Sequence, residues 1–428
     1  MTRERPAAQA ERRALAAWCL FDWANSPFPT VVVTFVFAAY FTEGIVGDSL
    51  RGTALWGQAM ALSGLAVALL APVLGAIADV GGRRKPWLFA ASLVTIAGGL
   101  LLWYATPEPE SALWALICVG VANAAFELGM VFYNAMLPDL TGRERLGRLS
   151  GWGWAFGYAG GLACLAIALV VFVGAEVPPF GLDSARAEHI RIVAPLAALW
   201  FAAFGWPLFA FVRDRPAARG VSPGDAVRRG FALLRQTFAG FRRYRTIFRF
   251  LLARMLYIDG LNTLFLFGGI YAAGSFGMDL GRVLAFGIAL NLSAGLGALG
   301  FAWVDDFLGA KRTLVISLLG LLLPGAVAVV APTEAWLWAS ALVLGVFIGP
   351  AQSASRSMMA RLSPPERRVQ MFGLFALSGR ITAFVGPALV GWVTVAFSSQ
   401  RAGMATILVF IAAGLALLLP LPDPDRKA

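Results

Sequence analysis

Long stretches with few charged residues recur along almost the whole chain and limit its possible folds more than any other feature. A helix needs about 20 apolar residues to cross the hydrocarbon core of a bilayer. Charged residues make up only 14% of the 428 residues, against roughly a quarter in an average soluble domain. The sequence therefore predicts an all-α integral membrane protein with twelve transmembrane helices. We expect these helices at residues 16–41, 53–79, 86–105, 111–137, 148–173, 191–212, 247–275, 280–305, 311–331, 335–360, 370–397 and 403–420.

One long polar stretch separates the sixth and seventh predicted helices. We therefore expect an N-terminal six-helix bundle at 1–212, a cytoplasmic linker at 213–246 and a C-terminal six-helix bundle at 247–428. Apolar residues recur every three or four positions in the linker between arginines, which predicts an amphipathic basic helix on the anionic inner leaflet. This helix is a spacer between the halves or, alternatively, a regulatory or partner-binding segment. Its apolar positions are Val227, Phe231, Leu234, Phe238 and Phe241.

The distribution of basic residues predicts the orientation of the chain in the membrane. Cytoplasmic loops carry an excess of Arg and Lys, and most of the 35 basic residues lie at the two termini, in the linker and in alternate loops. We expect a multi-pass protein of the cell inner membrane with both termini in the cytoplasm. This topology accounts for the net charge of +11, so no nucleic-acid partner is expected. No cleavable signal peptide is expected either, because the first apolar run is too long.

A short pattern of Asp and Asn occurs once in each half. Asp22 and Asn25 lie in the first predicted helix, and Asp259 and Asn262 lie in the seventh. The spacing of three places each pair on one helix face, and a carboxylate inside a membrane is costly unless it faces protein or water. The pattern predicts a duplicated transporter with a polar central path. The alternative is a purely structural pair of interhelical contacts. The segment Ser26-Pro27-Phe28-Pro29 in addition predicts a broken helix beside Asp22.

Further polar residues within the predicted helices are candidates for the same path. Glu127 joins Asp22 and Asp259 as a carboxylate that could carry a coupling proton. Arg254 and Arg356 are candidate counter-ions, or ligands for a substrate carboxylate, because a guanidinium can bind a carboxylate bidentately. Arg356 alternatively extends toward the cytoplasmic interface, as long basic side chains often do. Neutral donors and acceptors that could orient a zwitterion come from Asn25, Asn262 and Gln352.

Two loops carry related glycine and charge patterns at matching places in the halves. The residues are Gly75, Asp79, Gly82, Arg83 and Arg84 in the first copy and Asp306, Gly309 and Lys311 in the second. The first copy resembles the cytoplasmic loop motif of the major facilitator superfamily, and the second is weaker. The resemblance implies a latch that helps to hold the inner side closed, whereas the alternative is that these charges only cap helices and fix topology. An Asp there can accept hydrogen bonds from the N-terminus of a neighbouring helix.

A narrower resemblance extends over nearly the whole chain. The stretches that carry it begin Trp18-Cys-Leu-Phe-Asp22-Trp23, Tyr133-Asn134-Ala-Met-Leu137-Pro138-Asp139, Gly157-Tyr158-Ala-Gly160-Gly161, Gln352-Ser-Ala-Ser355-Arg356-Ser357 and Phe372-Gly373-Leu-Phe375, with Gly386-Pro387 after the last. They resemble the "unknown major facilitator" branch, which includes relatives of the autophagy-related vacuolar effluxer of yeast. The resemblance implies a major facilitator fold of two six-helix bundles, a monomer, and amino acids as a substrate class.

The sequence offers no pattern for catalysis, metal binding or a cofactor. Three cysteines lie in apolar stretches without CxxC spacing, and the single His189 has no cluster of ligands around it. We therefore expect no enzyme, no metal and no cofactor. The prediction is a secondary transporter that moves a small polar solute, such as an amino acid, by alternating access within the lipid bilayer, with the proton as coupling ion. The alternatives are efflux of a lipophilic drug or lipid-like molecule, and a non-transporting scaffold or lipid scramblase.

Overall fold

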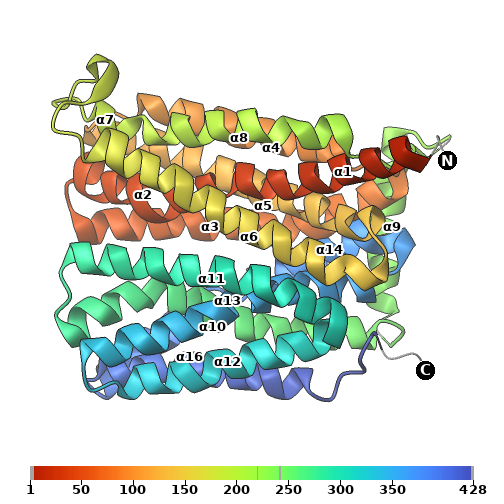
Figure 1. The fold of residues 1–428 in the computed structure, drawn as a ribbon. Helices are drawn as coiled ribbons and strands as arrows, with labels where there is room; N and C mark the ends of the chain where they lie inside the picture. The colour runs from red at the N-terminus through yellow and green to blue at the C-terminus, as the bar shows by residue number, and fades with distance from the viewer. Residues whose placement is uncertain (1–3, 219, 241, 426–428) are drawn as a thin grey trace. The chain divides into compact units, whose positions relative to one another are not determined.

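The computed structural model describes residues 4–218, 220–240 and 242–425, and these contain helices but no strand (Figure 1). Eleven helices in this part of the chain are long and apolar enough to cross a membrane. Helices form here because a backbone in lipid must satisfy its own hydrogen bonds. The N-terminal half contains α1 (Glu4–Asn25), η1 (Phe28–Phe35), α2 (Val36–Ala39), η2 (Tyr40–Val46), α3 (Ser49–Gly81), α4 (Lys85–Leu101), η3 (Leu102–Tyr104), η4 (Pro109–Ser111), α5 (Ala112–Leu140), η5 (Arg143–Arg145), α6 (Leu146–Ile167), η6 (Ala168–Val173), η7 (Pro179–Gly181), α7 (Glu188–Arg191) and α8 (Val193–Phe211).

The linker and the C-terminal half follow the same helical pattern. Most of these helices are close to the predicted ranges. The helices of this part of the chain are α9 (Pro223–Ala239), α10 (Arg245–Phe276), α11 (Leu280–Leu308), α12 (Ala310–Val330), α13 (Glu334–Leu362), η8 (Pro365–Arg367), α14 (Arg368–Ser378), α15 (Val385–Ala396) and α16 (Gln400–Leu418).

The described residues form two compact units. Unit 1 comprises residues 4–70, 82–133 and 156–218, and unit 2 comprises residues 71–81, 134–155, 220–240 and 242–425. Unit 2 therefore includes the ends of α3 and α5 and the start of α6, in addition to the helices from α9 onward. The predicted division of the chain at residues 212 and 247 stays a prediction.

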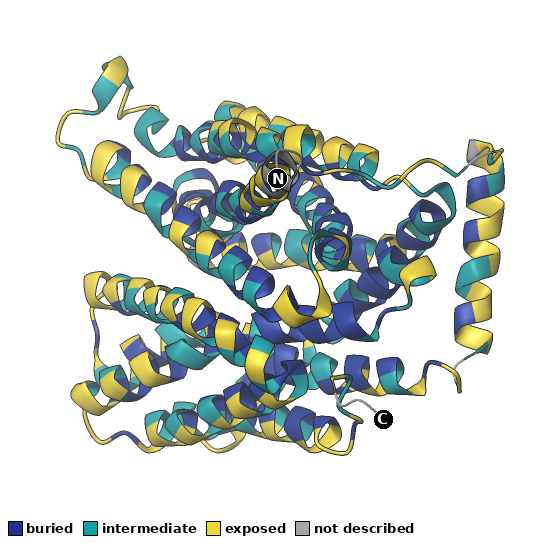
Figure 2. Cartoon of the chain, turned by 45° about the vertical axis from the view of Figure 1, so that its right-hand side comes forward, coloured by how far each residue is buried: buried dark blue, intermediate teal, exposed yellow. Residues whose placement is uncertain are grey.

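Several long helices carry both buried and exposed residues, drawn dark blue and yellow in Figure 2. On α3, Leu65 and Leu69 are more than half exposed, as are Ile117 and Val121 on α5. Positions four residues apart share one side of a helix. In a bilayer such sides contact lipid, so their exposure agrees with a membrane protein.

Aromatic contacts in unit 1 join the first residues of two stretches that carry the family resemblance. The rings of Trp18 and Tyr133 stack with their centroids 4.5 Å apart. The Tyr133 hydroxyl donates to the carbonyl oxygen of Trp18 at 2.9 Å, and the Trp18 indole nitrogen donates to the carbonyl oxygen of Tyr133 at 3.4 Å. This reciprocal pair fixes α1 against α5.

The first span is not broken at its prolines, contrary to prediction. The helix continues from α1 with a single turn residue at Ser26 and then widens into the π-helix η1. The amide of Ser26 donates to the carbonyl oxygen of Asp22, and that of Thr30 donates to Ser26, both at 3.2 Å. A π-helical turn accommodates residues that cannot keep the regular hydrogen-bond ladder. Pro27 and Pro29 therefore widen this helix but do not interrupt it.

The break occurs in the eleventh predicted span, which we expected to be continuous over 370–397. Helix α14 ends at Ser378, hydrogen-bonded turns follow, and α15 begins at Val385. Pro387 explains this position, because proline has no amide hydrogen and is tolerated in the first turn of a helix but not in its interior. The span is therefore two half-helices in sequence.

The linker contains helix α9, which covers most of the predicted amphipathic segment, while Phe241 lies outside the described residues. The side chain of Ser222 caps α9 by accepting the amide hydrogen of Asp225 at 3.1 Å. Val227, Phe231 and Phe238 are exposed by 43%, 53% and 49%. These three side chains leave an apolar stripe on the outer face of α9.

Candidate functional site

The predicted path residues are divided between the two units. Unit 1 contains Asp22 and Asn25 on α1 and Glu127 on α5, whereas unit 2 contains the candidates on α10 and α13. The structure therefore groups the candidates within each half, and a path shared by Asp22 and Asp259 stays a prediction.

In unit 1, the spacing of three places two polar side chains of α1 inside the fold. Asp22 is 5% exposed and Asn25 is 2% exposed. The Asn25 side-chain amide donates to the carbonyl oxygen of Phe21 at 2.7 Å. Asn25 also borders a small cavity with Ser92 and Thr95 of α4, two hydroxyl residues that the sequence analysis did not identify. Their spacing of three on one helix face was the available signal.

Helix α6 approaches α1 closely at its glycines. A Cβ atom built on Gly157 would lie 2.7 Å from Oγ of Ser26 and 3.6 Å from Cβ of Asp22. Any larger residue at position 157 would displace one of these groups. The glycine spacing thus places α6 against the polar part of α1.

In unit 2, Arg254 and Asp259 of α10 contact the two sides of the break between α14 and α15. Nη1 of Arg254 donates to the carbonyl oxygen of Phe375 at 2.7 Å and to Oγ of Ser378 at 2.8 Å. Oδ2 of Asp259 accepts the amide hydrogen of Gly386 at 3.2 Å. The sequence analysis predicted both charged residues as candidates but not these partners.

The remaining candidates of α10 and α13 lie in different surroundings. Asn262 is exposed, so it does not share the burial of Asp259 despite the spacing of three. Gln352 is half-buried. Arg356 is only 2% exposed, so protein surrounds its side chain, and its extension toward the cytoplasmic interface stays a prediction.

Arg356 connects two stretches that carry the family resemblance. Its Nε donates to Oγ of Ser150 at 2.9 Å, its Nη2 donates to the carbonyl oxygen of Ser150 at 2.6 Å, and its Nη1 donates to Oδ1 of Asn134 at 3.2 Å. Its guanidinium carbon lies 5.7 Å from the ring centroid of Trp154. These bonds hold the guanidinium between α13, the end of α5 and the start of α6.

The first loop motif contacts the start of α14. The carboxylate of Asp79 accepts the amide hydrogens of Val369 at 3.1 Å and Gln370 at 2.8 Å. A Cβ atom on Gly75 would lie 2.7 Å from the carbonyl oxygen of Val369, so only glycine allows this approach. An anion at a helix N-terminus is favourable because it interacts with the helix dipole.

The basic part of this motif belongs to unit 1. Arg84 is 2% exposed, whereas Arg83 is exposed. Asp214 accepts the amide hydrogens of Arg84 at 3.0 Å and Lys85 at 3.1 Å and so caps α4. Gly82 has a φ angle of +82°, a conformation that favours glycine. The sequence analysis missed Asp214, which lies alone in the linker without a motif around it.

The second motif copy makes the corresponding contact in unit 2. Oδ1 of Asp306 accepts the amide hydrogen of Arg148 near the start of α6 at 3.0 Å, and its Oδ2 lies 3.2 Å from Nε of the same arginine. The neighbouring Asp305 pairs with Arg361 at 2.5 Å, and both side chains are nearly inaccessible to solvent. Asp306 thus contacts the start of α6 as Asp79 contacts the start of α14.

The C-terminal segment packs on this second motif. Oδ2 of Asp425 accepts the amide hydrogen of Ala310 at 3.2 Å, and its Oδ1 lies 3.1 Å from Nε of Arg361. Nη2 of Arg143 donates to the carbonyl oxygen of Pro424 at 3.0 Å. Lys311 donates to the carbonyl oxygen of Leu419 at 2.8 Å. No pattern in the sequence indicated that this segment joins the contacts of the motif.

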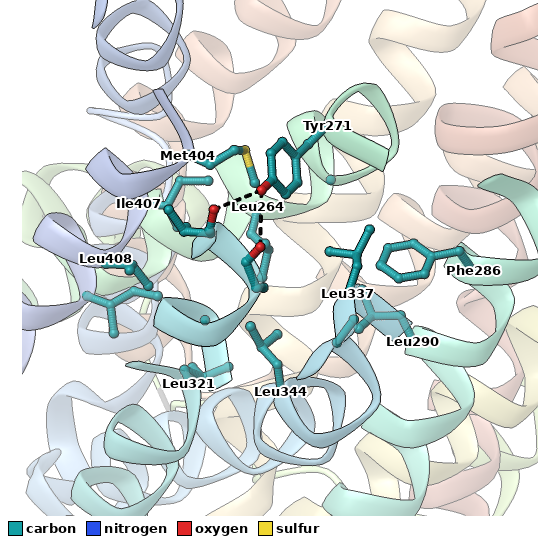
Figure 3. Close-up of a pocket in the computed structure, with 16 residues that line it drawn as sticks. Leu264, Tyr271, Phe286, Leu290, Leu321, Leu337, Leu344, Met404, Ile407 and Leu408 are labelled. Atoms are coloured by element: carbon teal, nitrogen blue, oxygen red, sulfur yellow. Dashed lines mark hydrogen bonds between the residues drawn. The ribbon is translucent and has the colours of Figure 1, made fainter. Parts of the chain in front are cut away.

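A separate cavity lies among helices α10, α11, α12, α13 and α16 of unit 2 (Figure 3). Its volume is about 60 Å³, and its lining is almost entirely aliphatic and aromatic. The Tyr271 hydroxyl lies 3.1 Å from the carbonyl oxygens of both Ala328 and Val329. None of the predicted polar path residues borders this cavity.

Within the described part of the chain, no group of three or more His, Cys, Asp or Glu residues is placed to hold a metal ion. Cys19, Cys118 and Cys164 are buried, and none of them forms a disulfide in the described part of the chain.

Comparison with known proteins identifies the family. The family described as "Vacuole effluxer Atg22 like" matches residues 44–427. The uncharacterized MFS-type transporter YxiO of Bacillus subtilis is 26% identical over 416 residues, which cover 95% of this chain and 94% of that protein. Autophagy-related protein 22-1 of Penicillium rubens is 26% identical over 301 residues, which cover 65% of this chain and 49% of that protein. The chain therefore matches about half the length of this fungal relative.

Solved structures support the same fold. The human organic anion transporter MFSD10 aligns with a TM-score of 0.74 and 14% identity, over 95% of this chain and 99% of that one. The proton:xylose symporter XylE aligns with a TM-score of 0.72 and 13% identity, over 97% of each chain. At these identities the alignments show the fold alone. The family match and the relative described as a transporter confirm the prediction that the chain is not an enzyme. The chain is a multi-pass membrane transporter of the major facilitator superfamily and belongs to the Atg22-like vacuole effluxer family.

Proposed function

We propose that this transporter moves a small polar solute, such as an amino acid, by alternating access and couples the movement to protons. The observation that carries the proposal is the burial of charged side chains within membrane-spanning helices. Asp22, Asp259 and Arg356 are each at most 5% exposed. Such groups are costly in a membrane and usually mark a substrate or ion pathway.

The chemistry of these groups matches a zwitterion. Arg254 and Arg356 can bind a carboxylate, and Asp22, Glu127 and Asp259 can bind an ammonium group or a proton. Asn25, Asn262 and Gln352 can orient the solute through neutral hydrogen bonds. Each half contributes both charged and neutral groups, which is consistent with a path between two pseudo-symmetric bundles.

We assign the two loop motifs to the closed state of the predicted cytoplasmic side. Asp79 contacts the start of α14, and Asp306 contacts the start of α6. Both contacts join the two halves of the sequence through a few directed hydrogen bonds. A transporter must break and re-form such contacts in each cycle. The other motif residues would support these contacts through close approach and charge. They are Gly75, Gly82, Gly309, Arg83, Arg84 and Lys311.

The apolar cavity in Figure 3 is the feature that bears on the lipophilic alternative. Sites for drug-sized ligands usually enclose about 300–1,000 Å³. At about 60 Å³ this cavity holds no more than a small apolar group. The cavity therefore does not favour efflux of a lipophilic drug over a polar solute.

We further propose that the protein acts as a monomer in the cell inner membrane, with both termini in the cytoplasm. The excess of basic residues in the linker and the alternate loops supports this orientation. The same topology places the contacts of Asp79 and Asp306 on the cytoplasmic side, where the superfamily motif lies. The two bundles would then be residues 1–212 and 247–428, joined by the linker at 213–246.

The experiment that tests this function is counterflow of a labelled amino-acid panel in proteoliposomes. Exchange of one or more amino acids by the purified, monodisperse protein is expected. Absence of exchange for the whole panel would remove this substrate class. A parallel assay of fluorescent phospholipid translocation in the same vesicles tests the scramblase alternative, for which we expect no activity above empty vesicles.

A further inference from the structure

The break between α14 and α15 exposes two helix ends inside a membrane-spanning segment, and α10 places a charge of the matching sign at each. The guanidinium of Arg254 donates to the carbonyl oxygen of Phe375 in the last turn of α14 and lies 3.5 Å from the Phe375 ring centroid. The carboxylate of Asp259 accepts the amide hydrogen of Gly386 in the first turn of α15. A cation at a helix C-terminus and an anion at an N-terminus are both favourable.

Only one of the two carboxylate oxygens of Asp259 accepts a hydrogen bond from the described residues. Its residue is 2% exposed. Oδ2 has the bond to Gly386, whereas Oδ1 is buried without a hydrogen-bond partner among the described residues. The nearby hydroxyl of Thr263 already donates to the carbonyl oxygen of Asp259, at 2.7 Å. A buried charged oxygen without a partner is destabilising, so this atom favours the arrival of a cation.

The charged groups around Asp259 leave this position available. Arg254 on α10 bonds to the end of α14. Arg356 on α13 bonds to Ser150 and Asn134, and Arg401 on α16 donates to the carbonyl oxygens of Val329 and Ala331. Within the described chain, none of these arginines is hydrogen-bonded to the Asp259 carboxylate, nor is Arg380 in the break.

We propose that Oδ1 of Asp259 is the binding position of the coupling proton. We further propose that this proton controls the strength of the hydrogen bond between Asp259 of α10 and the Gly386 amide of α15. The inference rests on the proposed transport function and selects one carboxylate among three candidates. Glu127 is partly exposed, and no oxygen of Asp22 or Glu127 is among the buried atoms without a partner. A proton needs one oxygen atom, whereas a metal cation such as sodium needs several ligands.

The proton balance is simple. A proton from one side of the membrane binds Oδ1 and converts the carboxylate into a neutral carboxylic acid, and the same proton later leaves to the other side. Oδ2 keeps its bond to the Gly386 amide in both states, but the bond is weaker in the neutral state because the charge is lost. Protonation therefore loosens α15 from α10 without breaking the chain's other contacts.

The test uses Asp259→Asn in proteoliposomes, with Asp48→Asn as the matched control, because Asp48 is an exposed carboxylate outside the candidate path. Glu127→Gln is measured beside them as the competing candidate. Asn keeps an oxygen for the Gly386 amide but cannot bind a proton at neutral pH. With one proton per solute, a pH gradient of one unit supports about tenfold accumulation, since about 1.4 kcal/mol is a factor of ten. We expect wild type and Asp48→Asn to accumulate solute, and Asp259→Asn to equilibrate it without accumulation while counterflow persists.

Several outcomes overturn the proposal. The proposal is wrong if Asp259→Asn accumulates solute at the wild-type level. It is also wrong if Glu127→Gln alone loses accumulation. Accumulation by the wild type that a sodium gradient drives and a pH gradient does not would replace the proton by sodium. If the wild type shows no counterflow, the proposed function fails instead.

A second measurement covers an Asn variant that loses counterflow or does not fold. Solute is added to the purified protein in weakly buffered detergent, and a pH dye records the protons exchanged. We expect Asp259→Asn, if folded, to show no proton exchange, and Asp259→Glu to show exchange with a pH profile displaced from the wild type. Wild-type exchange in Asp259→Asn, or an unchanged profile in Asp259→Glu, overturns the assignment.

Discussion

Removal of the Asp79 carboxylate should weaken the contact between α3 and α14 by a predictable amount. Asp79→Ala removes two hydrogen bonds from the first turn of α14 and one negative charge near its N-terminus. Loss of a helix cap costs about 1 kcal/mol and loss of the dipole interaction about 0.3–1 kcal/mol, up to ~2. The sum of roughly 1.5–3 kcal/mol corresponds to a shift of about 10- to 150-fold toward the open contact.

The assay is the labelling rate of a buried cysteine. Ser353 is 4% exposed in unit 2, and its carbonyl oxygen accepts a hydrogen bond from Ser150 at 2.8 Å. The background for this assay has Cys19, Cys118 and Cys164 replaced by Ala. In it, Ser353→Cys should react with a membrane-impermeant maleimide only when the proposed closed state, which includes the contact between α3 and α14, opens. We expect the labelling rate to rise by about 10- to 150-fold when Asp79→Ala is added.

A matched control is available at the other end of the same helix. Oδ1 of Asp48 accepts the amide hydrogen of Arg51 at 2.9 Å near the start of α3. Asp48→Ala thus removes a similar cap far along the helix from α14, and the labelling rate should not change. An unchanged rate in Asp79→Ala, with a normal melting temperature, would refute the assignment of Asp79 to the closed contact.

Three further predictions concern contacts in unit 2. Gly386→Ala should lower thermal stability in detergent by about 1–3 kcal/mol, because its Cβ atom would overlap Oγ1 of Thr263; the added change Thr263→Ala should restore part of it, and no restoration would contradict this reason. Arg356→Lys should lower the melting temperature, because an ammonium group cannot reproduce the two bonds to Ser150; an unchanged melting curve would argue against this role. Asp425→Ala should raise the labelling rate of Ser353→Cys, and high salt should reduce the difference from wild type, because Asp425 is partly exposed. A difference that high salt leaves unchanged would exclude a screened ion pair.

Much of the fold could be predicted from the sequence because lipid allows few alternatives. Long apolar runs must be helical. The all-α fold predicted from them and the major facilitator fold implied by the resemblance are confirmed by the comparisons. The position of helix interruptions was harder to predict. Two prolines in the first span suggested a break that the structure accommodates by π-helical turns, whereas Pro387 marks a real break. The difference depends on tertiary partners, since α10 provides charged groups for both ends of the eleventh span.

For the site, the sequence indicated which residues are polar within spans but not what they contact. The motif pattern correctly suggested that an Asp could accept hydrogen bonds at a helix N-terminus, yet it could not name α14 or α6. Asp214 and Asp425 lie in segments without a recognisable pattern, so their capping contacts become visible only in three dimensions. The exposure of Asn262 was missed because the spacing of three describes one helix alone and not its neighbours.

The contact of Asp79 with α14 also has a consequence for the synthesis of the protein. The carboxylate and the amide of Val369 are 290 residues apart in the chain. At about 5–20 residues per second, a ribosome needs roughly 15–60 s to make the second after the first. During that time the end of α3 has no α14 on which to pack. The contact is therefore among the last to assemble, and a chain that stops before α14 would leave this end of α3 open to a membrane protease.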